Sequence, residues 1–197
     1  IFPAIDPETV PYVGEPNATP PLLAGYAGNT DAYQGLTELI EGVALARKQG
    51  LDAKLHLVLT GDDTCARERI DTLGLAPFTS IVRNVSHAEA QQEMLKVSTI
   101  VIPRRNVLES VYGYPSKLPE ALAMGIPVIL TDVGPVPELM PEFGEHAIVV
   151  PAENIARHVA DALARVARMS VDERKAWGER ARAYAARFSW PQATAVA

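Results

Sequence analysis

Residues 99–131, TIVIPRRNVLESVYGYPSKLPEALAMGIPVILT, contain the alternation on which the prediction of the fold rests. Continuous apolar runs at 99–103 and 127–130 are typical of buried strands, and the segment 116–124 between them is predicted to be a helix. A strand, a helix and a second strand in this order indicate a parallel arrangement, because the helix carries the chain back to the edge where it started.

The same alternation runs along most of the chain. Apolar runs predict six strands, at 22–27, 55–60, 80–82, 99–103, 127–130 and 147–150. Helical spacing and two capping boxes (Ser86 with Glu89, Ser170 with Glu173) predict helices at 33–49, 64–73, 86–97, 116–124, near 137–140, and beyond 155 and 170. We therefore expect an α/β fold, a doubly wound and mainly parallel six-stranded sheet with helices on both faces. Ligands of such sheets bind at the carboxyl ends of the strands.

Residues 1–21 differ from the rest of the chain. They hold six of its 16 prolines and show neither a helical nor an alternating period. This composition predicts an extended, semi-rigid connector outside the core, followed by one folded domain over 22–197.

The composition excludes several classes of protein. Of the 197 residues, 48% are apolar and 21% are charged, which is ordinary for a soluble globular protein. The net charge of −6 argues against binding of nucleic acid or of an anionic membrane through bulk charge. A single cysteine, Cys65, excludes a disulfide framework and a cysteine zinc site, so a reducing, cytoplasmic location is expected. No apolar run approaches the ~20 residues of a membrane span.

Two groups of polar residues follow predicted strands without a distinctive motif. Gly28 comes directly after the first strand, where a ligand could approach the backbone, but an ordinary turn and helix cap is the favoured interpretation. The chain lacks the G-x-G-x-x-G dinucleotide pattern and the Walker lysine loop. Asp62 and Asp63 follow the second strand and are interpreted as helix caps rather than metal ligands. No metal site is expected, and no catalytic role is assigned to the four histidines, which lack ligand spacing: His56, His87, His146 and His158.

The stretch 101–138 combines the groups that a diphosphate and a ribose would require. Lys117 lies in the first turn of a predicted helix, and Arg104 and Arg105 precede it in the chain. A helix N-terminus with a lysine and one of these arginines is suited to phosphate oxygens, and the carboxylate of Glu120 could accept hydrogen bonds from two vicinal ribose hydroxyls. The alternative is that Glu120 only complements the helix dipole and that Lys117 is solvated. The residues alone leave both interpretations open.

Several short motifs in a collinear order carry a resemblance to a known family. Residues 119–129 (PEALAMGIPVI) are similar to the pattern E-A-x-A-x-G-x-P-V, and residues 132–138 (DVGPVPE) are similar to the loop G-G-x-P-E. Weaker similarities are carried by YAGN at 26–29 with YQGL at 33–36, by FSW at 188–190 and by PAID at 3–6. Together these motifs resemble the C-terminal, donor-binding half of a family 4 glycosyltransferase with the GT-B fold.

The resemblance implies a binding site for a nucleotide diphosphate sugar, which is the donor substrate, and it implies no other cofactor. Glu120 is then expected on the ribose, Lys117 on the phosphates, and Asn84 with Val85 beside the base, while the backbone of residues 113–116 approaches the sugar and the phosphates. No catalytic residue is assigned. The predicted donor-binding residues are Gly28, Asn29, Gln34, Asn84, Val85, Arg104, Gly113, Tyr114, Pro115, Ser116, Lys117 and Glu120.

Three positions depart from the pattern of the family. Tyr112 stands where the first glutamate of the family's glutamate pair is expected, and Asn29 and Gln34 replace an arginine and a lysine that commonly contact phosphate. Arg104 and Lys117 are expected to offset the two lost charges. The departures leave a second hypothesis open, in which the domain binds a nucleotide or serves as a scaffold without catalysis.

The resemblance also implies a larger protein. Residues 1–21 are expected to be an interdomain linker, and 170–197 a C-terminal helix that packs back toward a missing N-terminal domain. That domain would hold the acceptor, any catalytic base and any peripheral contact with a membrane, so the 197-residue chain alone is expected to be inactive. The whole enzyme is expected to transfer the sugar with retention of its anomeric configuration. A GT-B epimerase or phosphorylase is less consistent with these motifs.

Overall fold

One parallel sheet with helices on both faces forms the fold. The computed structural model describes residues 5–16, 18–138 and 144–188. Strands of these residues pair in the order β3-β2-β1-β4-β5-β6, and every pairing is parallel. The strands are β1 (Leu22–Asn29), β2 (Ala53–Thr60), β3 (Thr79–Arg83), β4 (Thr99–Ile102), β5 (Val128–Thr131) and β6 (Ile148–Val150). The predicted doubly wound, six-stranded sheet is therefore confirmed.

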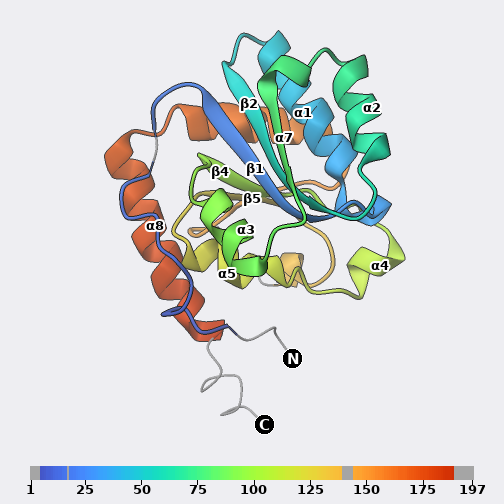
Figure 1. The fold of residues 1–197 in the computed structure, drawn as a ribbon. Coiled ribbons are helices and arrows are strands. Elements are labelled where there is room, and N and C mark those ends of the chain that lie inside the picture. The colour runs from blue at the N-terminus through green and yellow to red at the C-terminus, as the bar shows by residue number, and fades with distance from the viewer. Residues whose placement is uncertain (1–4, 17, 139–143, 189–197) are drawn as a thin grey trace.

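Helices form the outer layers (Figure 1). The α-helices are α1 (Leu36–Lys48), α2 (Thr64–Thr72), α3 (His87–Met94), α4 (Leu108–Val111), α5 (Lys117–Ala123), α7 (Ile155–Ala167) and α8 (Val171–Ala185). Helix α1 packs against α2 and α7 on one face, while α3 contacts β1 and α5 packs against α8 on the other. Both predicted capping boxes are confirmed, at the starts of α3 and α8. Within the described ranges, no helix has the length and apolar character that crossing a membrane requires.

The core follows from the apolar runs of the strands and the apolar stripes of the helices. All four residues of β4 and all four of β5 are buried, as expected for strands covered on both faces. On one face, Leu39, Ile40 and Val43 of α1 are fully buried beside Val159 and Leu163 of α7. This rigid platform holds the carboxyl ends of the strands, where the loops with the predicted site residues begin.

Gly35 divides the helix that the sequence predicts at 33–49. Its φ is +72°, the left-handed conformation that glycine adopts without strain. A Cβ atom at this position would lie 1.7 Å from the carbonyl oxygen of Pro103, in the loop after β4. α1 therefore begins at Leu36, after the short 3₁₀ helix η1 (Ala32–Gln34), and the loops after β1 and β4 are in direct contact.

Other differences from the sequence prediction are local. Helix α4 has only four residues, too few to show a helical period, and the sequence pattern does not predict it. Short 3₁₀ helices, η2 (Ala76–Phe78) and η3 (Ala186–Phe188), are also unpredicted. Part of the helical turn predicted near 137–140 lies outside the described residues, as do residues 3–4 of the PAID motif and 189–190 of the FSW motif.

Residues 5–16 pack against the folded domain, although their proline content predicts a connector outside the core. Val10 is buried in the main hydrophobic cluster. The backbone N–H of Ile5 donates to the carbonyl of Phe188 at 2.9 Å, and that of Val13 donates to the carbonyl of Met124 at 3.0 Å. The described part of this segment has turns and bends but no helix, in agreement with its lack of a period, and it is not extended throughout. Its placement wholly outside the core is wrong, because Val10 and Pro16 are buried. Its role as an interdomain linker stays a prediction.

Arg182 of α8 holds this segment in place. Its guanidinium donates to the carbonyl oxygens of Pro7, Val10 and Ala123 at distances of 2.7, 3.2 and 2.6 Å. Figure 1 shows the N-terminal residues running alongside α8. Because an arginine presents several donors in one plane, a single side chain satisfies carbonyls that an irregular, proline-rich backbone cannot pair with itself.

We expect Arg182→Ala to lower the free energy of unfolding by about 2 kcal/mol, because three carbonyls lose their charged donor. Urea unfolding of the variant measures this loss. Arg180→Ala is the matched control, since Arg180 lies exposed on the same helix and makes no hydrogen bond or ion pair with a described residue. The control should stay within about 0.5 kcal/mol of the wild type. Equal losses in both variants would contradict the anchoring role of Arg182.

Candidate functional site

The loops after β1 and β4 meet at the carboxyl edge of the sheet. The two strands are neighbours and parallel, with Gly25 opposite Ile100, so both end at the same edge. From there β1 leads to α1 on one face of the sheet, and β4 leads through α4 to α5 on the other face. Neighbouring strands whose connections diverge in this way mark the usual ligand position in open α/β sheets.

Gly28, near the end of β1, lies against Lys117, the first residue of α5. A Cβ atom at Gly28 would stand 1.8 Å from the Nζ atom of Lys117 and 2.8 Å from its Cε atom. Only a residue without a side chain lets the lysine amine rest on the backbone of β1. The fold thus joins two predicted donor-binding residues that are far apart in the sequence.

The amine of Lys117 is buried and has no hydrogen-bond partner among the described residues. It lies 4.8 Å from the centre of the Tyr26 ring. Burial, and then the nearby guanidinium of Arg104, lower the pKa of Lys117 from 10.5 to about 8, while Asp31 acts in the opposite direction. The interpretation of Lys117 as a solvated side chain is therefore wrong. A buried cation without an anion is unfavourable, and a bound anion would relieve that penalty.

One of the two arginines after β4 is expected to supply positive charge to a phosphate. The structure gives Arg104 and Arg105 different partners. Arg104 is buried, and its guanidinium donates to the carbonyls of Gly113 and Glu109. Arg105 is exposed and pairs with Glu38 of α1, with 3.0 Å between Nε and Oε1. The positive charge of Arg104 thus remains beside the site, but two of its nitrogens hold the loop between β4 and α5.

The predicted loop 113–116 keeps two of its side chains inside the protein. The ring of Tyr114 lies 6.5 Å from that of Phe188, and Pro115 is buried. Ser116 is exposed, and its hydroxyl caps no backbone N–H, so it occupies the N-cap position of α5 without acting as a side-chain cap. The side chain of Pro115 is therefore out of reach of a ligand, whereas that of Tyr114 is only partly buried.

Asn29 is the last residue of β1 and Gln34 the last residue of η1, and both make local hydrogen bonds. The Asn29 amide donates to Asp31 at 2.7 Å, while its Oδ1 atom is buried without a partner in the described part of the chain. The Gln34 amide donates to the hydroxyl of Tyr33 at 3.2 Å, and the ring of Tyr33 lies 5.5 Å from the guanidinium of Arg104. Neither amide supplies the charge that the family pattern places at these positions.

Asn84 and Val85 lie farther along the carboxyl edge. They follow β3, which is separated from β1 by β2. Asn84 is exposed and adopts a φ of +56°, and Val85 is partly buried directly before α3. The role of these two residues beside a nucleotide base stays a prediction.

Helix α3 holds the carboxylate of Glu120, which lies one turn after Lys117 on α5. The Oε1 atom of Glu120 accepts a hydrogen bond from Gln91 Nε2 and lies 2.9 Å from His87 Nε2. The sequence pattern does not reveal this contact, because the acid that His87 meets is on another helix. The capping box at Ser86 is the one available signal, since it places His87 and Gln91 one turn apart on the same helix face.

Asp62 and Asp63 both make contacts within the protein. Asp62, which precedes the N-cap position of α2, accepts a hydrogen bond from the backbone N–H of Thr64 at 3.0 Å and thus satisfies one free N–H group of the first turn, in part as predicted. Asp63 makes no such bond and instead pairs with Arg67 at 2.9 Å and with Arg83 at 3.0 Å, so the prediction of a second cap is wrong. In the part of the chain that the structure describes, no three His, Cys, Asp or Glu residues gather as a metal site.

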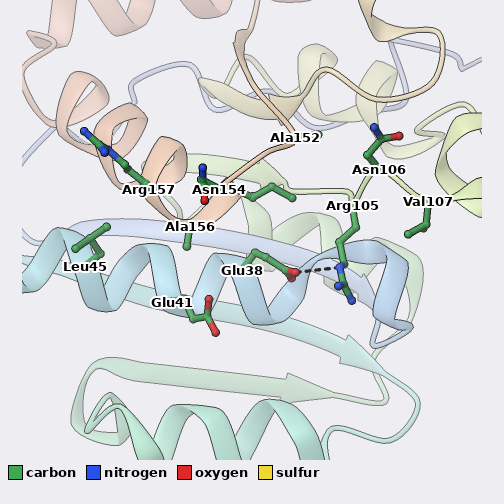
Figure 2. Close-up of a pocket in the computed structure, with 11 residues that line it drawn as sticks. Glu38, Glu41, Leu45, Arg105, Asn106, Val107, Ala152, Asn154, Ala156 and Arg157 are labelled. Atoms are coloured by element: carbon green, nitrogen blue, oxygen red, sulfur yellow. Dashed lines mark ion pairs between the residues drawn. The ribbon is translucent and has the colours of Figure 1, made fainter.

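A cavity of about 570 Å³ lies elsewhere, between α1, the loop after β4 and the start of α7 (Figure 2). Its two carboxylates are already paired, Glu38 with Arg105 and Glu41 with Arg69. None of the predicted donor-binding residues lines it. We therefore place the candidate site at Lys117, whose amine has no hydrogen-bond partner among the described residues, and not in this cavity.

The fold is that of the Rossmann-like domains found in GT-B glycosyltransferases. The chain belongs to the glycosyl transferases group 1 family, whose model matches residues 21–169. No curated protein sequence matches the chain.

Solved glycosyltransferase structures share this fold at low sequence identity. Sucrose-phosphate synthase from Thermosynechococcus elongatus is 22% identical, with a TM-score of 0.71 over 95% of this chain and 48% of its own. Anabaena HepE in complex with UDP-glucose is 17% identical, with a TM-score of 0.71 over 91% and 49%. The C-terminal domain of LpcC, a group 1 family protein from Francisella tularensis, is 17% identical, with a TM-score of 0.60 over 91% and 94%. The chain thus spans about half the length of the first two structures.

We expect Lys117→Met to stabilise the chain. Because the pKa of Lys117 falls from 10.5 to about 8 on folding, its protonated form disfavours the folded state fully below pH 8, and the penalty fades as the pH rises toward 10.5. The variant should gain about 3 kcal/mol at neutral pH and progressively less between those two pH values. Urea unfolding at both ends of the range measures the gain, with the exposed Lys175→Met as control. A variant less stable than the wild type at neutral pH would contradict the penalty.

Proposed function

We propose that the chain is the C-terminal, donor-binding half of a retaining family 4 glycosyltransferase. Its substrate would be a nucleotide diphosphate sugar, and the acceptor would be held by a separate N-terminal domain. The observation that carries this proposal is the buried amine of Lys117, which rests on Gly28 without a hydrogen-bond partner among the described residues. An anion is the ligand that such a group favours.

The neighbouring groups fit a nucleoside diphosphate. The diphosphate would lie at the amine of Lys117, which rests against the backbone of Gly28, with the charge of Arg104 nearby. One helical turn away, the carboxylate of Glu120 would accept hydrogen bonds from the ribose hydroxyls. The base would extend along the carboxyl edge toward Asn84.

The chemistry follows from where charge develops. Breaking the bond between the sugar and the diphosphate increases the negative charge on the leaving group. In the proposed complex Lys117 would lie beside that charge, and the burial of its amine would strengthen the interaction. The diphosphate would raise the pKa of Lys117 and keep its amine protonated. We assign no nucleophile or base to this chain, and we expect it to be inactive without the acceptor domain.

The structural neighbours support a nucleotide-sugar ligand and a larger protein. HepE from Anabaena has been solved in complex with UDP-glucose, and TarM from Staphylococcus aureus in a complex that includes UDP. The chain covers 49% of the length of HepE and 36% of that of TarM. These proportions leave room in the relatives for the domain that we propose for the acceptor.

A second candidate function is nucleotide binding without sugar transfer. Tyr112, at the place expected for the first glutamate of the family's pair, is 87% exposed and offers no carboxylate. Asn29 and Gln34 are neutral where the family pattern has cations. Transfer assays on the protein with its acceptor domain separate the two candidates, since binding without transfer would favour the second.

We expect the 197-residue chain to bind at least one of UDP, GDP and ADP in isothermal titration calorimetry. Lys117→Met should weaken that binding by about tenfold or more, because a charge-assisted hydrogen bond to phosphate is lost. Near pH 8, binding should take up protons, which appears as a binding heat that depends on the ionisation enthalpy of the buffer.

Lys175→Met, which removes an exposed lysine on α8, is the matched control and should bind like the wild type. Failure of all three diphosphates to bind the wild type at millimolar concentration would overturn the donor site. Equal affinities of wild type and Lys117→Met would show that the anion lies elsewhere.

A further inference from the structure

Two side chains of α3 contact the carboxylate of Glu120, and both contact the same oxygen, Oε1. Gln91 Nε2 donates to Oε1, and His87 Nε2 lies 2.9 Å from the same atom. The two α3 side chains also touch each other, with 3.2 Å between Gln91 Nε2 and His87 Nε2. Contact from two side chains of a different helix restricts rotation of the carboxylate about its last bond.

The other oxygen of Glu120 is left for a ligand. Among the described residues, no hydrogen bond or ion pair to Oε2 occurs, and the side chain is 21% exposed. An ionised carboxylate accepts on both oxygens, so Oε2 keeps its full capacity. Because Oε1 is held on the α3 side, Oε2 is the oxygen that remains open to accept.

Helix α3 is itself held against the sheet, which fixes the positions of the two side chains that contact Glu120. Its N-terminus is closed by the capping box of Ser86 and Glu89. Farther along, Glu93 lies 2.9 Å from His56, a buried residue of β2 whose other ring nitrogen lies 2.6 Å from Ser80 of β3. The position of α3, and hence of the donors on it, is set by strands outside the candidate site.

We propose that Gln91 and His87 are positioning residues that orient Glu120 so that Oε2 faces the vicinal hydroxyls of the ribose. This proposal rests on the proposed function, since it requires a nucleotide at Lys117. It assigns to α3 the discrimination between ribonucleotides and deoxyribonucleotides. A freely rotating Glu120 would bind the same hydroxyls less well, because it would lose rotamer freedom on binding.

The test compares the affinity of the chain for a nucleoside diphosphate and for its 2′-deoxy analogue, using whichever of UDP, GDP and ADP binds the wild type. We expect the wild type to prefer the ribonucleotide by about tenfold, the effect of one hydrogen bond to a charged group. Gln91→Met, which keeps the length of the side chain but not its donor, and His87→Ala should each reduce the preference to about threefold. The double variant and Glu120→Ala should bring it close to unity.

Gln92→Ala is the matched control, because Gln92 is the exposed neighbour of Gln91 on α3. It should retain the wild-type preference, and thermal unfolding should show that all variants are folded. The ratio of the two affinities is the deciding quantity, since general damage to the fold weakens both ligands alike.

The outcomes separate this proposal from the one on which it rests. If no ribonucleotide binds the wild type, the donor site fails and the positioning role falls with it. If ribonucleotides bind but Gln91→Met and His87→Ala leave the preference unchanged, the donor site stands and the positioning role is overturned. Tighter binding of the ribonucleotide to either variant would show that α3 blocks Glu120 instead of orienting it.

Discussion

The parallel pairing of β1 with β4 is the constraint on which the candidate site depends. Each strand connects onward to the neighbour on its far side, β1 to β2 and β4 to β5, so right-handed crossovers send their helices to opposite faces. The loops after the two strands therefore share one edge and come into contact. Two glycines allow close contacts here, because a neighbouring atom fills the space that a Cβ atom would need. This atom is the carbonyl oxygen of Pro103 at Gly35 and the amine nitrogen of Lys117 at Gly28.

The same contact makes the site unfavourable in the absence of an anion. Lys117 is buried next to a second cation, Arg104, and its lowered pKa expresses the resulting penalty. The free energy gained from the apolar packing of β4 and β5, and of α1 against α7, offsets the cost of burying this charge. A buried charge that destabilises the edge of an otherwise well-packed sheet is typical of a ligand site, because the ligand provides the missing countercharge.

Long-range contacts also explain where the sequence predictions fall short. Proline-rich residues 5–16 lack a period, yet Arg182 of α8 supplies donors for their carbonyls and Val10 enters the core. The role of Arg104 in holding its loop, and the contact of His87 with an acid on another helix, have no local signature. Such partners lie far away in the chain, whereas periodicity and capping report only on neighbours within a few residues.

The sequence by itself determined the strands, most of the helices, the parallel sheet and the two capping boxes, because apolar periodicity and local hydrogen bonding specify these. The motifs, through the resemblance that they carry, also named Gly28, Lys117 and Glu120 as donor-binding residues, and this stays a prediction. Only the tertiary structure decided that Lys117 is buried and unpaired among the described residues and that α3 holds Glu120. Those properties depend on how α3, α5 and the end of β1 pack together, because a side chain becomes buried or paired only when elements distant in the sequence come into contact.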